Sequence, residues 1–364
     1  CIRPLCHTSS DINLPWNSMT QKKAQKNVTA DTAKANPDTA VPATMHAIVQ
    51  TDADDPQSLE LTQVDVPTLR AGEVLVKVAA SGVNRADLLQ AKGAYPPPPG
   101  ASELIGLEAA GTIVDAGDTG RVVGEEVGAL LAGGGYAEYV AVPEGQLTPI
   151  PEGYSLEDTA SVVEVACTVW SNLVMTAGLS SGQTILIHGG GGGIGTFAIQ
   201  VAKKLGAKVA VTAGSAEKLE TCKKYGADIL INYKEEDFVD KLKGSCDVIL
   251  DIIGAKYLKQ NLKSLAKDGK LVIIGMQGGT KEEINLGAVL ANRLSIFGTT
   301  LRSRDTEAKS EIVRETVANV WPWLADGSIT HHRHASYPLA DAIAAHQALD
   351  SGEVTGTLVL TQSS

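Results

Sequence analysis

The chain has 364 residues, which is enough for two domains that each bury a core of their own. Glycine is abundant at 37 residues and aromatic residues make up only 4%, a balance that favours an α/β protein over an aromatic-rich β-sandwich. The net charge of −11 argues against a nucleic-acid surface, because phosphate backbones attract clustered lysine and arginine.

No apolar run reaches the roughly 20 residues that a membrane-spanning helix needs. The five cysteines are scattered along the sequence and include no CxxC pair. This usage is typical of a reducing compartment without a disulfide framework, so we expect a cytoplasmic protein.

Residues 1–44 differ in composition from the rest of the chain. They are rich in Ser, Thr, Asn, Ala and Lys and show no sustained period of 2 or 3.6, which predicts a disordered N-terminal extension. A targeting peptide is one alternative, although arginine is nearly absent and no apolar h-region is visible. The sequence starts at Cys1 instead of Met, so we expect its beginning to be truncated, processed or an artefact.

From Met45 to about Glu164 the sequence pattern is that of β-structure. Strand-like alternation of apolar and polar residues recurs at 45–50, 73–79, 111–115 and 136–142. Four consecutive prolines follow Tyr95, and they can continue neither a helix nor a central strand, so they predict a rigid loop. We interpret this half as a partly open β-barrel.

From Leu156 onward, predicted helices and strands alternate. A helix is expected over 156–177, and short apolar strands are expected at 184–188, 208–212, 229–232, 247–253, 270–274 and 294–298. Such alternation specifies a parallel sheet covered on both faces, and six strands match a full dinucleotide-binding fold. A helix over 307–324 and the short strands after it are expected to return to the first half.

A glycine-rich segment follows the strand at 184–188. Gly190 to Gly195 satisfies the GxGxxG pattern and opens a predicted helix over 193–205. Glycine lets the backbone approach a pyrophosphate, and the helix N-terminus offers it free N–H groups and a positive dipole end. The segment therefore predicts dinucleotide binding, and a merely flexible turn is the alternative.

The end of the next strand indicates which dinucleotide is bound. An acidic residue there would accept a hydrogen bond from the ribose 2′-hydroxyl of NAD, but no acid follows Thr212 directly. Ser215 and Lys218 follow instead, and a hydroxyl donor with a nearby cation suits a 2′-phosphate. The sequence therefore favours NADPH over NADH.

The sequence offers no convincing metal site. Catalytic zinc needs three Cys, His or carboxylate ligands and structural zinc usually needs four clustered cysteines, yet the β-rich half has no cysteine after Cys6. The only histidine cluster, His331-His332-Arg333-His334, is interpreted as solvated surface. We therefore expect no bound metal.

Many separate segments between Met45 and Leu360 resemble the zinc-free NADPH:quinone oxidoreductase branch of the medium-chain dehydrogenase/reductase superfamily, and most closely its p53-inducible type. The matching segments are 78–89, 97–102, 106–111, 133–139, 142–145, 187–189, 212–215, 232–238 and 301–305. Zinc-containing relatives have a cysteine near Asn84 and a histidine at Leu107, and Glu164 stands at their third ligand position. At 356–357 this chain has Gly-Thr where relatives often have Gly-Lys.

The resemblance implies an α/β fold in which a GroES-like, partly open β-barrel (45–164 and 302–364) accompanies a Rossmann doubly wound parallel sheet (165–301). It implies two catalytic residues, Asn84 and Tyr95, which would donate hydrogen bonds to developing oxyanion charge beside the nicotinamide. The alternative for Asn84 is that its side chain only stabilises a turn. The alternative for Tyr95 is that its ring only packs on the prolines. The cofactor-binding residues that it implies are Thr168, Gly192, Gly193, Ile194, Gly195, Ser215, Lys218, Tyr233, Ile253, Gly254, Gly275, Met276, Leu301, Arg302 and Ser303.

The implied activity is zinc-independent hydride transfer from NADPH to a quinone or a similar electrophilic carbonyl. The alternatives are an NADPH-dependent alkenal or enone reductase and a non-catalytic NADPH-binding sensor. We expect a small-molecule substrate and neither a nucleic-acid nor a membrane partner. Relatives commonly pair the edge strands of two Rossmann sheets, so we also expect a homodimer through residues 294–300.

Overall fold

A computed structural model describes residues 41–362 of the chain. The predicted N-terminal extension, 1–44, lies outside the described residues except for its last four. Of these, Thr44 already begins the first strand, one residue before the predicted start at Met45.

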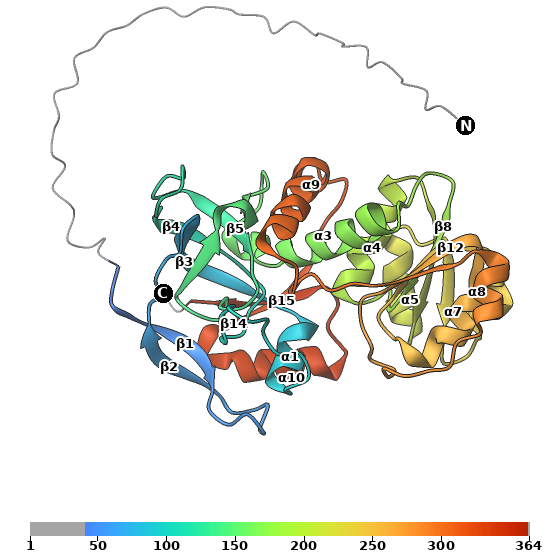
Figure 1. The fold of residues 1–364 in the computed structure, drawn as a ribbon, viewed down its shortest axis with the longest axis horizontal. Coiled ribbons are helices and arrows are strands. Elements are labelled where there is room, and N and C mark those ends of the chain that lie inside the picture. The colour runs from blue at the N-terminus through green and yellow to red at the C-terminus, as the bar shows by residue number, and fades with distance from the viewer. Residues whose placement is uncertain (1–40, 363–364) are drawn as a thin grey trace, which may run out of the picture. The chain divides into compact units, whose positions relative to one another are not determined.

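The first half of the chain folds mainly into one antiparallel sheet. Its strands, together with two from the C-terminal end, are β1 (Thr44–Gln50), β2 (Leu59–Asp65), β3 (Glu73–Val83), β4 (Glu108–Asp115), β5 (Glu126–Leu130), β6 (Tyr139–Pro143), β7 (Leu147–Pro149), β14 (Arg333–Pro338) and β15 (Thr357–Thr361). Seven of them form a sheet in the order β14-β15-β3-β4-β5-β7, with β6 also paired to β3, and β1 pairs with β2 separately. The C-terminal strand β15 lies antiparallel to β3, with Val359 opposite Gly82 (Figure 1).

The second half contains the predicted parallel sheet, which is confirmed. Its strands are β8 (Thr184–His188), β9 (Lys208–Ala213), β10 (Ile229–Asn232), β11 (Cys246–Asp251), β12 (Leu265–Ile273) and β13 (Ser295–Gly298). They lie in the order β10-β9-β8-β11-β12-β13, and every neighbouring pair is parallel. The order reverses between β8 and β11, and such a reversal leaves a crevice at the carboxyl ends of the strands.

Helices cover both faces of this parallel sheet (Figure 1). The helices of the structure are α1 (Arg85–Ala91), α2 (Leu156–Thr159), α3 (Val163–Trp170), α4 (Gly193–Lys204), α5 (Ala216–Lys224), α6 (Phe238–Leu242), α7 (Leu258–Ser264), α8 (Leu286–Asn292), α9 (Thr306–Ala325) and α10 (Ala342–Ser351), with 3-10 turns η2 (Glu144–Gln146), η4 (Ala255–Tyr257) and η5 (Leu339–Asp341) and a π-helix η3 (Ser171–Thr176). Along β8, Ile185 packs in one core with Phe197 of α4, whereas its neighbour Leu186 packs in another with Leu262 of α7. This alternation is what a strand buried on both faces requires.

The helical stretch predicted over 156–177 is present, but it is interrupted at 160–162. Helix α2 ends at Thr159, α3 begins at Val163, and the π-helix η3 follows it from Ser171. At the start of α3 the backbone N–H of Glu164 has no intrahelical acceptor, and it donates to the Glu108 side chain at 2.8 Å. The interruption therefore gives a buried carboxyl group a donor that a continuous helix would have used internally.

None of the helices that the structure describes in residues 41–362 is long and apolar enough to cross a membrane. Within the same range, Cys167, Cys222 and Cys246 are buried free thiols.

Candidate cofactor and catalytic site

The glycine-rich loop lies at the carboxyl end of β8 and leads into α4, whose N-cap is Gly192. At Gly190 and Gly195 its backbone is packed so tightly that a side chain would not fit. A Cβ atom on Gly195 would lie 2.6 Å from the Gly190 Cα atom, and one on Gly190 would lie 2.9 Å from the Val211 Cβ atom. Because Gly192 has no side chain to cap α4, the first N–H groups of the helix at Gly193, Ile194 and Gly195 can receive an anion.

Three of the predicted residues come together beside this loop. Ser215 is the N-cap of α5, and its Oγ atom accepts a hydrogen bond from the Lys218 backbone N–H at 3.3 Å. The Lys218 side chain lies against Gly191, and its Nζ atom donates to the Gly352 carbonyl oxygen. Tyr233 is half exposed and reaches back over Gly214. A hydroxyl, a cation and a phenol thus lie where β9 and β10 end.

The loops after β11 and β12 lie against one another. Ile253 and Gly254 follow β11, and Gly254 has a φ of 78°, which favours glycine. A Cβ atom on Gly254 would lie 3.1 Å from the Met276 Cα atom, and one on Gly275 would lie 2.9 Å from the Ile252 carbonyl oxygen. The four residues predicted from these loops therefore share one wall of the crevice, and the Met276 side chain is exposed there.

The predicted catalytic residue Asn84 caps the N-terminus of α1 and belongs to a buried polar network. Its Nδ2 atom donates to Glu108 Oε1 at 2.8 Å, and Glu108 Oε2 accepts the Glu164 N–H. The Thr168 hydroxyl donates to Glu164 Oε1 at 2.7 Å. The structure thus connects Asn84 and Thr168, both expected beside the nicotinamide, through two carboxyl groups.

Burial controls the protonation of these carboxyl groups. Burial raises the pKa of Glu108 well above its usual value, and the neighbouring Glu164 carboxyl raises it further. Burial also raises the pKa of Glu164, partly opposed by the Thr168 hydroxyl.

Leu107, at a position where zinc-containing relatives have a ligand, is buried and apolar. Within residues 41–362, no group of three His, Cys, Asp or Glu side chains is arranged to hold a metal ion.

A third carboxyl group, Asp87, is also buried, and it was not predicted from the sequence. One of its oxygens accepts from the Asn84 backbone N–H at 2.7 Å and from the Tyr136 hydroxyl at 3.2 Å, and that hydroxyl also contacts His346 Nε2. Its other oxygen is buried without a hydrogen-bond partner. Burial raises the pKa of Asp87 to about 7, so the group keeps its proton to a higher pH than a solvated aspartic acid does. An acid on the apolar face of a predicted helix would have been the signal for it.

Tyr95 is held by residues that follow β13. Its hydroxyl lies 2.7 Å from the Thr300 hydroxyl. The Arg302 guanidinium lies 5.4 Å from the Tyr95 ring centroid and donates to the Tyr95 carbonyl oxygen at 3.0 Å. The same guanidinium donates to the Ala132 carbonyl oxygen and to Gln90 Oε1.

Each of the three guanidinium nitrogens of Arg302 thus donates to a protein acceptor, and the cofactor contact expected of this residue stays a prediction. Of its neighbours, Leu301 packs against the core and Ser303 is exposed.

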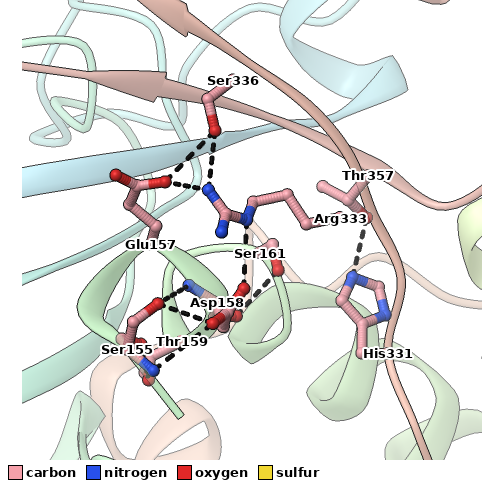
Figure 2. Close-up of polar contacts among 9 residues, drawn as sticks. All are labelled: Ser155, Glu157, Asp158, Thr159, Ser161, His331, Arg333, Ser336 and Thr357. Atoms are coloured by element: carbon pink, nitrogen blue, oxygen red, sulfur yellow. Dashed lines mark hydrogen bonds and ion pairs between the residues drawn. The ribbon is translucent and has the colours of Figure 1, made fainter.

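The histidine cluster is only partly solvated surface. His332 and His334 are exposed, as expected, but His331 and Arg333 are engaged with other residues (Figure 2). The His331 Nε2 atom lies 3.1 Å from the Thr357 hydroxyl, and burial lowers the pKa of His331 to about 4. Arg333 forms ion pairs with Glu157 and Asp158 at the start of α2. For Arg333 and His334 the difference follows from β14, which begins at Arg333 and presents every second side chain inward.

Comparison with known proteins extends over most of the chain. Residues 70–152 match the model of the alcohol dehydrogenase GroES-like domain, and residues 193–324 match that of the zinc-binding dehydrogenase family. The mouse (Mus musculus) quinone oxidoreductase is 30% identical over 338 residues, which cover 87% of this chain and 97% of the mouse protein.

The chain also matches part of a much longer protein and the whole of a solved structure. A Mycolicibacterium smegmatis mycocerosic acid synthase-like polyketide synthase is 31% identical over 84% of this chain, which spans only 15% of that protein. The crystal structure of Escherichia coli quinone oxidoreductase complexed with NADPH superimposes with a TM-score of 0.77 at 28% identity. That match covers 88% of this chain and all of the bacterial one.

Proposed function

Since this chain belongs to the quinone oxidoreductase family of the medium-chain dehydrogenase/reductase superfamily, we propose that it is an NADPH-dependent quinone oxidoreductase. The observation that carries the proposal is the arrangement at the switch of strand order, where a closely packed glycine loop lies beside Ser215 and Lys218. The NADPH complex of the similar Escherichia coli enzyme supports the same cofactor.

The residues of the crevice fit such a cofactor. The start of α4 at Gly192, Gly193, Ile194 and Gly195 would receive the pyrophosphate, and Ser215, Lys218 and Tyr233 would surround the 2′-phosphate. Ile253, Gly254, Gly275, Met276 and Thr168 would line the rest of the dinucleotide. When bound, the reduced nicotinamide supplies the hydride, so the protein has to supply orientation and electrostatics.

Two polar groups of the barrel half would assist the reaction. The Asn84 amide uses one N–H on Glu108 and has a second one to donate to the developing oxyanion. The Tyr95 hydroxyl, fixed by Thr300, would be the second donor. Solvent would deliver the proton that completes reduction of the acceptor.

We propose that this chemistry is independent of zinc. Of the three positions where zinc-containing relatives have ligands, one is occupied by Leu107, which cannot coordinate a metal. Another lies at or near Asn84, whose amide nitrogen donates to Glu108. The remaining carboxylate, Glu164, cannot hold a catalytic zinc ion alone.

The assembly and location of the protein belong to the same proposal. Strand β13 is an edge of the parallel sheet, and its Ile296 is 37% exposed. Leu286 and Leu290 of the preceding helix α8 are 70% and 81% exposed. An unpaired edge next to exposed large apolar side chains is typical of a self-association surface, so we propose a homodimer through 294–300 and α8. We propose one domain of residues 45–164 with 302–364 and another of residues 165–301, and the pairing of β15 and β14 with the sheet of the first half supports this division. The free cysteines support the proposed cytoplasmic location.

An acceptor panel tests the proposed activity. The purified protein is mixed with NADPH and either an ortho-quinone or an alkenal, and loss of the reduced-nicotinamide absorbance is followed. Turnover of the quinone supports the proposal. Turnover of the alkenal alone would indicate an enone reductase, and NADPH binding without turnover of either acceptor would indicate a sensor.

A further inference from the structure

Four buried polar side chains form a continuous hydrogen-bonded chain beneath the crevice. They are Thr212 on β9, His188 at the end of β8, Asn261 on α7 and Asp251 at the end of β11, and each is at most 1% exposed. Thr212 Oγ1 lies 3.0 Å from His188 Nδ1, and His188 Nε2 lies 2.8 Å from Asn261 Oδ1. Asn261 Nδ2 donates to Asp251 Oδ2 at 3.1 Å.

The donor and acceptor of every hydrogen bond in this chain follow from the bond between Asn261 and Asp251. Because the Asn261 amide nitrogen donates to Asp251, the amide oxygen faces His188 and must accept from a protonated Nε2 atom. The unprotonated Nδ1 atom then accepts from the Thr212 hydroxyl. Burial lowers the pKa of His188 to about 4, and the rings of Phe238 and Tyr257 pack against it with centroids 4.9 Å away. A neutral imidazole in a single tautomer results.

Each end of the chain holds one of the two loops that face the crevice. At one end, Asp251 accepts the backbone N–H groups of Ile253 at 2.7 Å and Gly254 at 3.2 Å. At the other end, the Thr212 carbonyl oxygen accepts the N–H of Gly190 in the glycine loop at 3.0 Å. The two loops come from strands β8 and β11, which flank the switch point, so the network spans it.

We propose that His188 and Asn261 are positioning residues that fix the spacing between the glycine loop and the Ile253–Gly254 turn, so that one dinucleotide can contact both without reorganising them. The inference rests on the proposed function, because it assigns both loops to the same NADPH molecule. It goes further by giving two residues that contact no cofactor a direct effect on its affinity.

Isosteric substitutions test this network. Asn261→Leu interrupts the chain at its centre with little change in volume, and Thr212→Val removes only a hydroxyl group. Thr212→Ser keeps that hydroxyl and should bind NADPH as the wild type does. Ser264→Ala is the matched control, because Ser264 is equally buried on the same helix and its hydroxyl has no hydrogen-bond partner.

NADPH affinity is measured by fluorescence titration at a temperature where every variant is folded. Asn261→Leu should weaken binding by about tenfold or more and Thr212→Val in the same direction, whereas Thr212→Ser and Ser264→Ala should match the wild type. Hydrogen exchange at the Gly190 and Gly254 amides should accelerate in the first two variants only. A purely structural role would lower the melting temperature without changing affinity, and that result would overturn the inference.

Two further results keep the test decisive. If Asn261→Leu does not fold, wild-type affinity in Thr212→Val overturns the inference. Nitrogen NMR of His188 should show the proton on Nε2, and a proton on Nδ1 would also overturn it. A wild-type protein that binds no NADPH would contradict the proposed function instead. In that case, the hydrogen-exchange rates of the variants and the tautomer of His188 would still show whether the network holds the loops.

Discussion

Substitution of Asn84 by alanine tests both the network around Glu108 and the proposed role of Asn84 in the reaction. The change removes the 2.8 Å hydrogen bond from Asn84 Nδ2 to Glu108 Oε1. Glu108 is fully buried, and only the backbone N–H of Glu164 would then still donate to it.

A buried acceptor that loses one of its partners costs about 1–3 kcal/mol in the free energy of unfolding. We therefore expect Asn84→Ala to destabilise the protein by an amount in that range, measured by urea denaturation at neutral pH. The double variant Asn84→Ala/Glu108→Leu should be less destabilised than the sum of its single changes, because each single change removes the hydrogen bond between the two side chains. Unchanged stability in Asn84→Ala would refute the assignment of this bond.

The same variant separates the two roles of Asn84. If its second N–H also stabilises an oxyanion, turnover of a quinone should fall by roughly 10-fold to 1000-fold while NADPH affinity changes little. Tyr95→Phe, which removes only the hydroxyl that contacts Thr300, should show a similar loss of turnover without the loss of stability. Reduced stability with unchanged turnover would leave Asn84 with a structural role alone.

Three other expectations follow from particular contacts. Lys218→Ala should weaken NADPH binding by about tenfold or more and leave NADH binding unchanged, since only NADPH has the 2′-phosphate; equal losses in two titrations would contradict this. Leu290→Asp should yield monomers in analytical ultracentrifugation where the wild type is a dimer, and a dimeric variant would exclude α8 from the interface. Asp87, with its pKa raised to about 7 from 3.8, binds its proton more tightly in the folded state, so it should lower stability by at most about 4 kcal/mol as pH rises from about 4 to 7. Urea denaturation of Asp87→Asn at both ends of that range should show a smaller decline than the wild type, and identical slopes would refute the shift.

The strands of the parallel sheet were predictable because each is an apolar run bounded by turn residues. Two predicted strands, 184–188 and 229–232, coincide with β8 and β10. The glycine loop was equally predictable, since it lies between one of these strands and a helix. Such signals are local, and they do not depend on which segments meet in the folded chain.

Features that depend on distant segments could not be predicted. The break between α2 and α3 accompanies a hydrogen bond to Glu108, which lies 56 residues earlier in the chain. Arg302 reaches backbone carbonyl groups at Ala132 and Tyr95, so its spacing in the sequence gives no sign that it is used inside the protein. Only the family resemblance implied a cofactor contact for Arg302, and the structure adds the protein acceptors around it.

The central claim, hydride transfer from NADPH without a metal, is tested most directly by a kinetic isotope effect in metal-free protein. The protein is treated exhaustively with a chelator and supplied with an ortho-quinone and NADPH deuterated at the nicotinamide C4 carbon. We predict that chelation leaves the rate and the melting temperature unchanged, and that a single turnover is slower with the deuterated cofactor than with the ordinary one. Stoichiometric zinc that is lost together with activity, or the absence of any NADPH-dependent quinone reduction, would contradict the account.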